Sequence, residues 1–384
     1  MKFSSLLAKV SLAISISLIF GSSSNQAFGL VHNLKNLKQE KTKPEILLRN
    51  WGLENNELPS HINARKAWNI TKGEKSIVVA VIDTGIDSTH PDLKDNLWKK
   101  PGTKDEYGFD FVTNTKNPKD QHGHGTHVAG IIGATAKAGA SGVAPNISIM
   151  TVRYYSDSAN GATNLANTIK AINYAIDNGA NIINYSGGGA EFSSSEMKAI
   201  QRAENKGILF VAAAGNEYQN TDNTGSKYYP GAYGLSNIIT VAATNIKNQL
   251  LPSSNWGLQN VHVAAPGENI FSTLPNGRYG YLTGTSQATA FVSGLAALIL
   301  SENPKLTPAE VKNMIMNSAD KFKNLKDKLA SGGRINAYTA VVAAQATTES
   351  KTHIVLANKE NNSIAVKENR YQKLKRKVAF SKKE

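Results

Sequence analysis

The sequence predicts an α/β protein in which a doubly wound, mostly parallel sheet is covered by helices on both faces. Between about residues 76 and 300, short runs rich in β-branched residues alternate with helical patterns, which is typical of βαβ units. In addition, Asp83 and Asn216 each follow an apolar run. They would lie at the carboxyl ends of strands, where sheets of this kind collect functional groups.

Each expected element follows from a local pattern. Strands are expected at residues 76–82, 147–152, 208–214 and 237–243, with another starting at Ile182. Helices are expected at residues 164–177 and 194–206, because a glycine follows each segment and, in the first, apolar residues recur on one face. Thr307 and Glu310 form a capping box with a proline between them, which predicts the start of a further helix.

The two ends of the chain differ in composition from its middle. Residues 1–29 have a basic start, an apolar run and a small-residue cleavage site, which predicts a secretory signal peptide. Residues 30–50 are interpreted as a short propeptide or linker, residues 51–344 as one domain, and residues 345–384 as a basic tail. The protein is therefore expected to be secreted or held in the cell envelope, extracellular or periplasmic.

Composition narrows the possible functions. There is no cysteine, which excludes disulfides, thiolate metal sites and a thiol nucleophile. The formal net charge is +14, but the tail alone has ten Lys and Arg against four Asp and Glu. A charge run of this kind is typical of a solvated tail, so no nucleic-acid partner is expected, and the tail is predicted to contact anionic envelope surfaces.

Four segments contain the kinds of group that peptide hydrolysis needs: a nucleophile, a base, a group that orients the base, and an oxyanion donor. These residues are Asp83 after a strand, His122, His124 and His127 in a glycine-rich segment, Asn216 after a strand of small residues, and Ser286 before a buried helix. Taken singly, each also fits an ordinary turn, cap or helix start.

The three histidines allow more than one interpretation. One of them can act as a general base. Alternatively, the H-x-H-x-x-H spacing together with Asp120 fits a metal site, or the histidines are simply solvated at a helix start. The residue types alone leave these possibilities open.

Together, the four segments resemble the subtilisin-like (subtilase) family. They read D-T-G-I-D from residue 83, H-G-T-H-V-A-G from residue 124, A-A-G-N from residue 213 and G-T-S-x-A from residue 284. They occur in the family's order, and the order Asp, His, Ser is that of subtilisin. The resemblance runs from roughly Trp51 to Ala344.

The resemblance implies a serine endopeptidase that acts on protein or peptide substrates, as a monomer and with broad specificity. Ser286 would be the nucleophile, His124 the base, Asp83 its orienting carboxylate and Asn216 an oxyanion donor, and no cofactor would be needed for the chemistry. His127 would then be a supporting residue. The resemblance also implies substrate-binding residues, namely Ser186, Gly187 and Gly188 at an edge that pairs with the peptide, Ala213 and Gly215 in a pocket wall, and Glu217 at the pocket rim.

The sequence departs from the family's pattern at several positions. Gln287, Ala290 and Phe291 replace a methionine and a proline-histidine pair common in the family. Asp92 matches a carboxylate that ligates calcium in many members, but residues 134–142 lack the asparagines that usually complete the site. Asp92 is therefore interpreted either as a ligand in a weak structural calcium site or as a turn residue.

Two other functions compete with the peptidase. A metal-dependent hydrolase would use the histidines and Asp120 but leaves the segments of Asp83, Asn216 and Ser286 unexplained. A catalytically silent family member would bind peptides or anionic polymers through its groove and tail without cleaving them. That interpretation leaves unexplained why all four catalytic parts are present in one chain.

Overall fold

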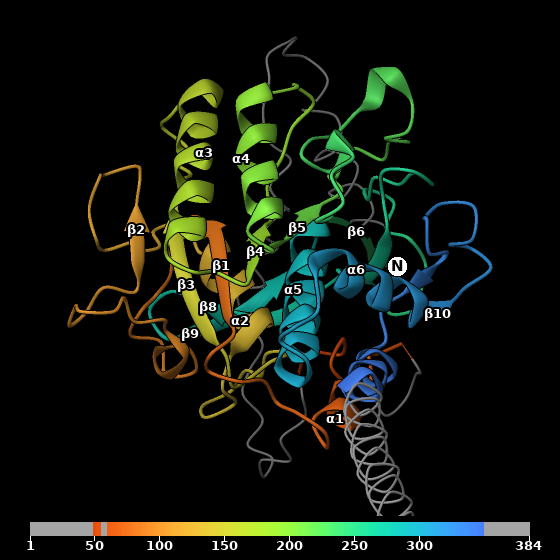
Figure 1. The fold of residues 1–384 in the computed structure, drawn as a ribbon, viewed down its shortest axis with the longest axis horizontal. Helices are drawn as coiled ribbons and strands as arrows, with labels where there is room; N and C mark the ends of the chain where they lie inside the picture. The colour runs from red at the N-terminus through yellow and green to blue at the C-terminus, as the bar shows by residue number, and fades with distance from the viewer. Residues whose placement is uncertain (1–48, 55–59, 349–384) are drawn as a thin grey trace, which may run out of the picture.

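The computed structural model describes residues 49–54 and 60–348 (Figure 1). The expected signal peptide, residues 1–29, lies outside this range. So do most of the expected propeptide or linker, residues 30–50, and most of the basic tail, residues 345–384.

A nine-stranded sheet forms the centre of the described chain, in the order β10-β11-β7-β6-β5-β4-β1-β3-β2. All neighbouring pairs are parallel except β10 and β11. The strands are β1 (Val78–Asp83), β2 (Gly108–Asp110), β3 (Ser148–Arg153), β4 (Ile182–Tyr185), β5 (Leu209–Ala213), β6 (Ile238–Thr244), β7 (Val263–Pro266), β10 (Asp320–Lys321) and β11 (Gly333–Arg334). A separate antiparallel hairpin consists of β8 (Ile270–Leu274) and β9 (Arg278–Leu282).

Helices cover both faces of the sheet (Figure 1). The α-helices are α1 (Ala64–Ala67), α2 (His124–Gly133), α3 (Gly161–Asp177), α4 (Ser194–Asn205), α5 (Thr285–Glu302) and α6 (Pro308–Asn317). Residues 337–348 are also helical. Short 3₁₀ turns occupy Lys94–Asn96, Thr224–Ser226 and Gly231–Tyr233. The pair α3 and α4 packs on one face, whereas α2 and α5 pack on the other.

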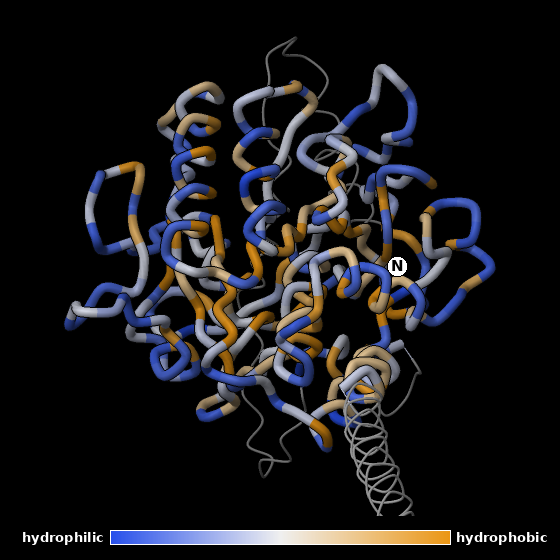
Figure 2. Tube along the Cα trace, in the orientation of Figure 1, coloured by the Kyte–Doolittle hydropathy of each residue, from blue (hydrophilic) through white to orange (hydrophobic). Residues whose placement is uncertain are grey.

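Strand β1 shows why both faces must be covered. Val79 and Val81 pack in the core beneath α2 and α5, whereas Ala80 and Ile82 pack in the core beneath α3 and α4. All six residues of β1 are buried, and Figure 2 shows the central strands as the apolar part of the trace. A strand buried on both faces reads as a continuous apolar run, which is why the sequence reveals it.

The predicted fold class is confirmed, and the predicted strands and helices occur close to their expected positions. For example, α3 begins at Gly161 rather than at residue 164, because Asn160 caps it by accepting a hydrogen bond from the Thr163 N–H at 2.8 Å. The capping box of Thr307 and Glu310 is present at the start of α6. The hairpin β8–β9 was not predicted, because β9 is largely exposed or half-buried and lacks an apolar run.

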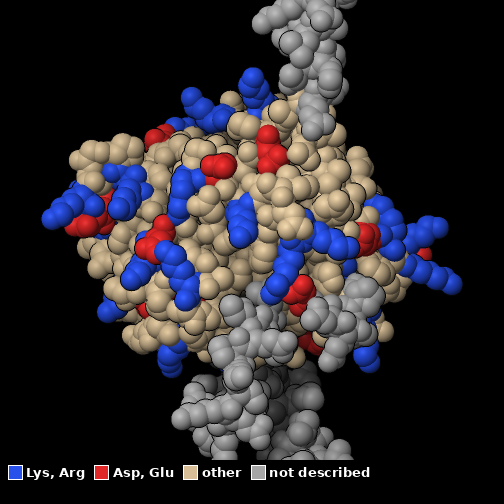
Figure 3. Space-filling view, turned by 90° about the horizontal axis from the view of Figure 1, so that it is seen from below, with Lys and Arg blue, Asp and Glu red and all other residues tan. Residues whose placement is uncertain are grey.

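Lys and Arg side chains are distributed among acidic ones on the face that Figure 3 shows, rather than gathered in one patch. None of the helices in the described part of the chain has the length and apolar character needed to cross a bilayer.

Candidate active site

Two of the residues predicted to form the triad, Asp83 and His124, come together at the carboxyl end of β1. Asp83 is the last residue of β1, and His124 is the first residue of α2. Their side chains meet at 2.8 Å between Asp83 Oδ1 and His124 Nδ1, and both are almost completely buried. The backbone N–H of Thr84 also donates to Asp83 Oδ1, at 2.7 Å. The carboxylate is thus held in one orientation against the imidazole.

The pair changes the acid-base behaviour of His124. Burial alone would lower the pKa of its imidazole. The negative charge of Asp83 and the hydrogen bond to it favour the protonated ring, and the resulting pKa is raised above the ordinary value of 6.5. An imidazole that is paired with a carboxylate in this way can accept a proton during a reaction and return it later.

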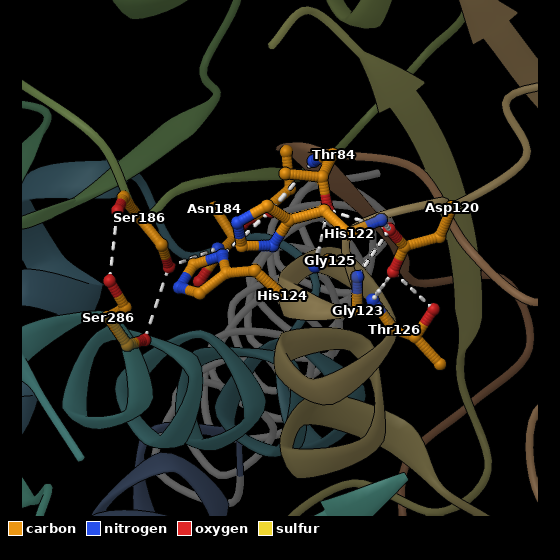
Figure 4. Close-up of polar contacts among 11 residues, drawn as sticks. Thr84, Asp120, His122, Gly123, His124, Gly125, Thr126, Asn184, Ser186 and Ser286 are labelled. Carbon is orange, nitrogen blue, oxygen red and sulfur yellow. Dashed lines mark hydrogen bonds and ion pairs between the residues drawn. The ribbon is translucent and has the colours of Figure 1, made fainter. Parts of the chain in front are cut away.

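Ser286 lies in the first turn of α5, where the first backbone N–H groups of a helix have no partner within the helix and the dipole favours negative charge. Its hydroxyl donates to the carbonyl of Ser186 at 3.0 Å, and the Ser186 hydroxyl donates to the Ser286 carbonyl at 3.2 Å. The buried Asn184 supports this contact by donating to Ser186 Oγ at 3.1 Å. In Figure 4, Ser186 and Ser286 lie on one side of His124 and Asp120 on the other.

Asn216 is held beside the same helix start. Its Oδ1 accepts a hydrogen bond from the Thr285 N–H at 3.0 Å and from the Thr285 hydroxyl at 3.2 Å. Because the carbonyl end of the amide is fixed in this way, the orientation of its NH₂ group is also fixed. A preorganised donor of this kind suits an oxyanion.

Asp120 fixes the loop in front of α2, a role that the sequence did not reveal. Its Oδ1 accepts from the N–H groups of His122 and Gly123 at 2.9 and 2.8 Å and from the Thr84 hydroxyl at 3.0 Å. Its Oδ2 accepts from the Thr126 N–H at 2.9 Å and the Thr126 hydroxyl at 2.6 Å (Figure 4). Five donors on one buried carboxylate tie the end of β1 to the start of α2.

The three histidines have separate environments, which does not fit the predicted alternative of a shared metal site. His127 is completely buried, its Nε2 lies 3.2 Å from the Gly280 carbonyl, and burial lowers its pKa to about 3. The ring centroid of His122 lies 6.3 Å from that of His124. Within residues 49–54 and 60–348, no three His, Asp or Glu side chains are grouped so that they could hold a metal ion.

Asp92, the predicted calcium ligand, is surrounded by hydrogen-bond donors. Its Oδ1 accepts from the Ala138 N–H at 2.7 Å, and its Oδ2 accepts from the Ala140 N–H at 2.9 Å and the Tyr279 hydroxyl at 2.8 Å. A calcium ion needs oxygen ligands in these directions. The described residues therefore do not fit a calcium site here, and the contacts instead tether residues 134–142 to β9.

The predicted substrate-binding residues surround one cavity, with one exception. Ser186, Gly187, Gly188, Ala213 and Glu217 line a cavity of about 500 Å³ that also reaches Asn216 and Thr285. Gly215 is not among its described lining residues. It has a φ of 97°, so it serves the turn between β5 and Asn216, because this backbone conformation favours glycine.

The sequence did not single out Glu196 and Tyr228, which also line this cavity. Ser193 and Glu196 have the spacing of a capping box, and Ser193 does cap α4 by accepting from the Glu196 N–H at 3.2 Å. The Glu196 carboxylate, however, contacts the Tyr233 hydroxyl at 2.6 Å. The spacing of Glu196 from Ser193 thus indicated helix capping and did not indicate that its carboxylate lines the cavity.

We expect Asp120→Ala to lower the free energy of unfolding by about 2–4 kcal/mol, because it leaves several buried donors without an acceptor. Asp120→Asn should cost less, since it keeps one carbonyl acceptor. Asp177→Ala is the matched control, because Asp177 forms an exposed ion pair with Arg202 and such pairs contribute at most about 1 kcal/mol. Urea unfolding would measure all three, and equal values for Asp120→Ala and Asp177→Ala would contradict the role of Asp120.

Comparisons with known proteins agree with the resemblance predicted from the four segments. A family model described as the subtilase family matches residues 74–356. The chain is 40% identical over 285 residues to the thermophilic serine proteinase of Bacillus sp. (strain AK1), covering 74% of this chain and 66% of that protein. It is 40% identical over 286 residues to thermitase of Thermoactinomyces vulgaris, covering 74% of this chain and 94% of thermitase.

The structure is also similar to a solved protease from Pseudoalteromonas arctica PAMC 21717, with a TM-score of 0.66 and 28% sequence identity over 77% of this chain and 97% of that one. The chain therefore belongs to the subtilase family of serine-type endopeptidases.

Proposed function

We propose that this protein is a secreted serine endopeptidase that uses Asp83, His124 and Ser286 as its catalytic triad. The observation that carries the proposal is the buried contact of 2.8 Å between Asp83 and His124. Ser286, in the first turn of the buried helix α5, would supply the nucleophile that this pair needs. The family assignment supports the same reaction class.

The chemistry follows from these positions. The Ser286 hydroxyl turns from the Ser186 carbonyl to His124, gives its proton to Nε2 of the ring and attacks the carbonyl carbon of the substrate. The Asp83 carboxylate stabilises the imidazolium that forms. His124 then gives the proton to the leaving amine, which separates from an acyl-enzyme. A water molecule, deprotonated by His124, hydrolyses the ester and restores the Ser286 hydroxyl.

The oxyanion would be bound by two donors, the Asn216 side-chain NH₂ and the Ser286 backbone N–H. The contacts of Thr285 with Asn216 Oδ1 orient this amide before the substrate arrives, so the donor needs little reorganisation during the reaction. No metal or other cofactor has a part in these steps, and each proton transfer uses a residue named above.

Substrates would be extended peptides that pair with residues 186–188 through main-chain hydrogen bonds. Such pairing tolerates many side chains, so we propose broad specificity outside the cavity described above. We further propose that the protein acts as a monomer after export, with residues 1–29 as its signal peptide. Those residues lie outside the described range, and their composition supports the proposal.

A serine-directed fluorophosphonate tests the triad. We expect it to label the wild type but neither Ser286→Ala nor His124→Ala, and a chelator should leave both labelling and cleavage of an unfolded protein unchanged. In subtilisin, loss of the nucleophile lowers kcat by about 10⁶-fold and loss of the oxyanion amide by about 10²–10³-fold. Ser286→Ala should therefore be far more damaging than Asn216→Ala.

Circular dichroism of each variant would control for folding. A folded wild type that binds peptides without labelling or cleavage would establish the silent binder instead. Activity that survives Ser286→Ala but not the chelator would establish the metal-dependent hydrolase.

The raised pKa of His124 predicts the acid limb of the pH profile. His124 must be neutral to accept the Ser286 proton, so kcat/KM for an uncharged peptide should fall as the pH drops through a pKa above 6.5. Asp83→Asn removes the negative charge that raises this pKa but leaves the burial that lowers it. The acid limb of its residual activity should therefore move to lower pH, and an unmoved limb would contradict the assignment of Asp83.

We also propose that the basic tail holds the protein at anionic envelope surfaces, as its ten Lys and Arg suggest. Deletion of residues 345–384 should abolish salt-sensitive binding to anionic vesicles and leave peptide hydrolysis unchanged, because simple electrostatic attraction is screened by salt. Vesicle co-sedimentation at low and high salt would measure this, and undiminished binding of the truncated protein would contradict it.

A further inference from the structure

The cavity beside the proposed nucleophile has an acidic interior. It is lined by Asn216 and Thr285, by residues 186–189 and Ala213, and by Glu196 of α4. Among its described lining residues, three are glutamates and one is a lysine: Glu191, Glu196, Glu217 and Lys227. The cavity therefore has an excess of two formal negative charges, in a chain whose own net charge is +14.

Glu196 provides a buried carboxylate in this cavity. It lies in the first turn of α4, and only 4% of the residue is exposed. The Tyr233 hydroxyl donates to Oε2 at 2.6 Å, which fixes the carboxylate without neutralising its charge. Burial raises the pKa of Glu196 to about 6, so it is ionised near neutral pH. A cation that pairs with a buried carboxylate of this kind stabilises its negative charge.

Glu217 provides a second carboxylate, on the more exposed side of the cavity. Asn255 Nδ2 donates to Glu217 Oε2 at 2.6 Å, and Asn255 Oδ1 accepts from the N–H groups of Glu217 and Gln219 at 3.2 and 2.8 Å. Asn255 itself is buried and also donates to the Ala214 carbonyl at 2.9 Å. The backbone and the side chain of Glu217 are thus both held by one rigid neighbour.

Tyr228 lines the same cavity as the two carboxylates. Burial raises the pKa of its phenol, with the negative charges of Glu217 and Glu196 raising it further. Both charges therefore act on the same phenol. A side chain that enters the cavity beside Tyr228 meets negative potential from both glutamates.

We propose that Glu196 and Glu217 make this cavity select a lysine or arginine side chain in the residue that supplies the scissile carbonyl. The inference rests on the proposed function, because it places the scissile bond at Ser286 and Asn216. A long cationic side chain that enters the cavity would be attracted by both carboxylates. An apolar side chain would remove water from them without compensation, and an acidic one would be repelled.

The test compares peptides that differ only in the residue before the scissile bond: Lys, Arg, Leu, Phe or Glu. For the wild type, we expect kcat/KM for the Lys and Arg peptides to exceed that for the Leu peptide by about 10- to 100-fold, the effect of a hydrogen bond to a charged group. In the double variant Glu196→Gln, Glu217→Gln, this ratio should fall by at least about tenfold, while Gln keeps an acceptor for Tyr233 and a similar volume.

Glu204→Gln is the matched control, because it makes the same change on α4 outside the cavity, where Glu204 accepts hydrogen bonds from Ser236. For this variant, the ratio of kcat/KM for the Lys and Arg peptides to kcat/KM for the Leu peptide should equal that of the wild type. A wild type that prefers Leu or Phe would overturn the proposal, and so would a double variant that keeps the preference for Lys and Arg.

A measurement of peptide binding distinguishes a failure of this proposal from a failure of the proposed function. In Ser286→Ala, isothermal titration calorimetry should show tighter binding of the Lys peptide than of the Leu peptide, and the difference should disappear when both glutamates are also replaced. If the wild type hydrolyses no peptide but this difference is found, the proposed function fails and the selectivity stands. Equal binding of the two peptides would overturn the selectivity even in an active enzyme.

Discussion

The site depends on a carboxylate that is buried at the end of the central strand. Asp83 is 2% exposed, and an unpaired charge in such a place would cost several kcal/mol. The structure compensates by bringing His124 and the Thr84 N–H to the same oxygen. Because β1 fixes the position of Asp83, the helix that starts at His124 must begin within hydrogen-bonding distance of that strand. The polar contacts around Asp120 serve this requirement.

The parallel sheet explains how the other parts reach the same place. Strand β1 lies between β4 and β3, and β5 lies next to β4. The carboxyl ends of β1, β4 and β5 therefore carry Asp83, Ser186 and Asn216 at one edge of the sheet. Ser286, the proposed nucleophile, is carried by a helix instead of a strand. Helix α5 packs across these strands from one face, and its first turn contacts Ser186. The order of the strands thus brings together groups that are far apart in the sequence.

Much of this arrangement could be predicted from the sequence, for physical reasons. Strands buried on both faces have continuous apolar runs, so β1, β3, β5 and β6 were predicted. The four motif segments predicted the residues that meet at the edge of the sheet, although the residue types alone did not choose among His122, His124 and His127. The choice of His124 came from the family resemblance. The contact with Asp83 now supports it geometrically.

The residues that the sequence did not reveal are those whose roles come from long-range packing. Glu196 has the spacing of a helix cap, and only the fold brings Tyr233 to its carboxylate. In the sequence, Asp120 resembled a metal ligand beside histidines. In the structure, five hydrogen-bond donors surround its carboxylate. Asp92 likewise matched a calcium ligand, yet residues 134–142 turn N–H groups toward it. In each case the sequence identified a carboxylate, but it did not predict which groups the fold would turn toward that carboxylate.

The charges of the protein constrain how it could recognise a basic substrate. The chain has a formal net charge of +14, and removal of residues 1–29 would take away only Lys2 and Lys9. The protein therefore repels a cationic peptide at long range, and long-range attraction cannot produce a preference for lysine. At physiological ionic strength this repulsion is screened beyond about 8 Å, whereas a pair formed with the buried carboxylate of Glu196 would be screened much less. The proposed selectivity would therefore arise after the peptide has bound, from contacts inside the cavity. A preference that survives added salt would have this origin, whereas one that vanished with salt would point to attraction at the surface.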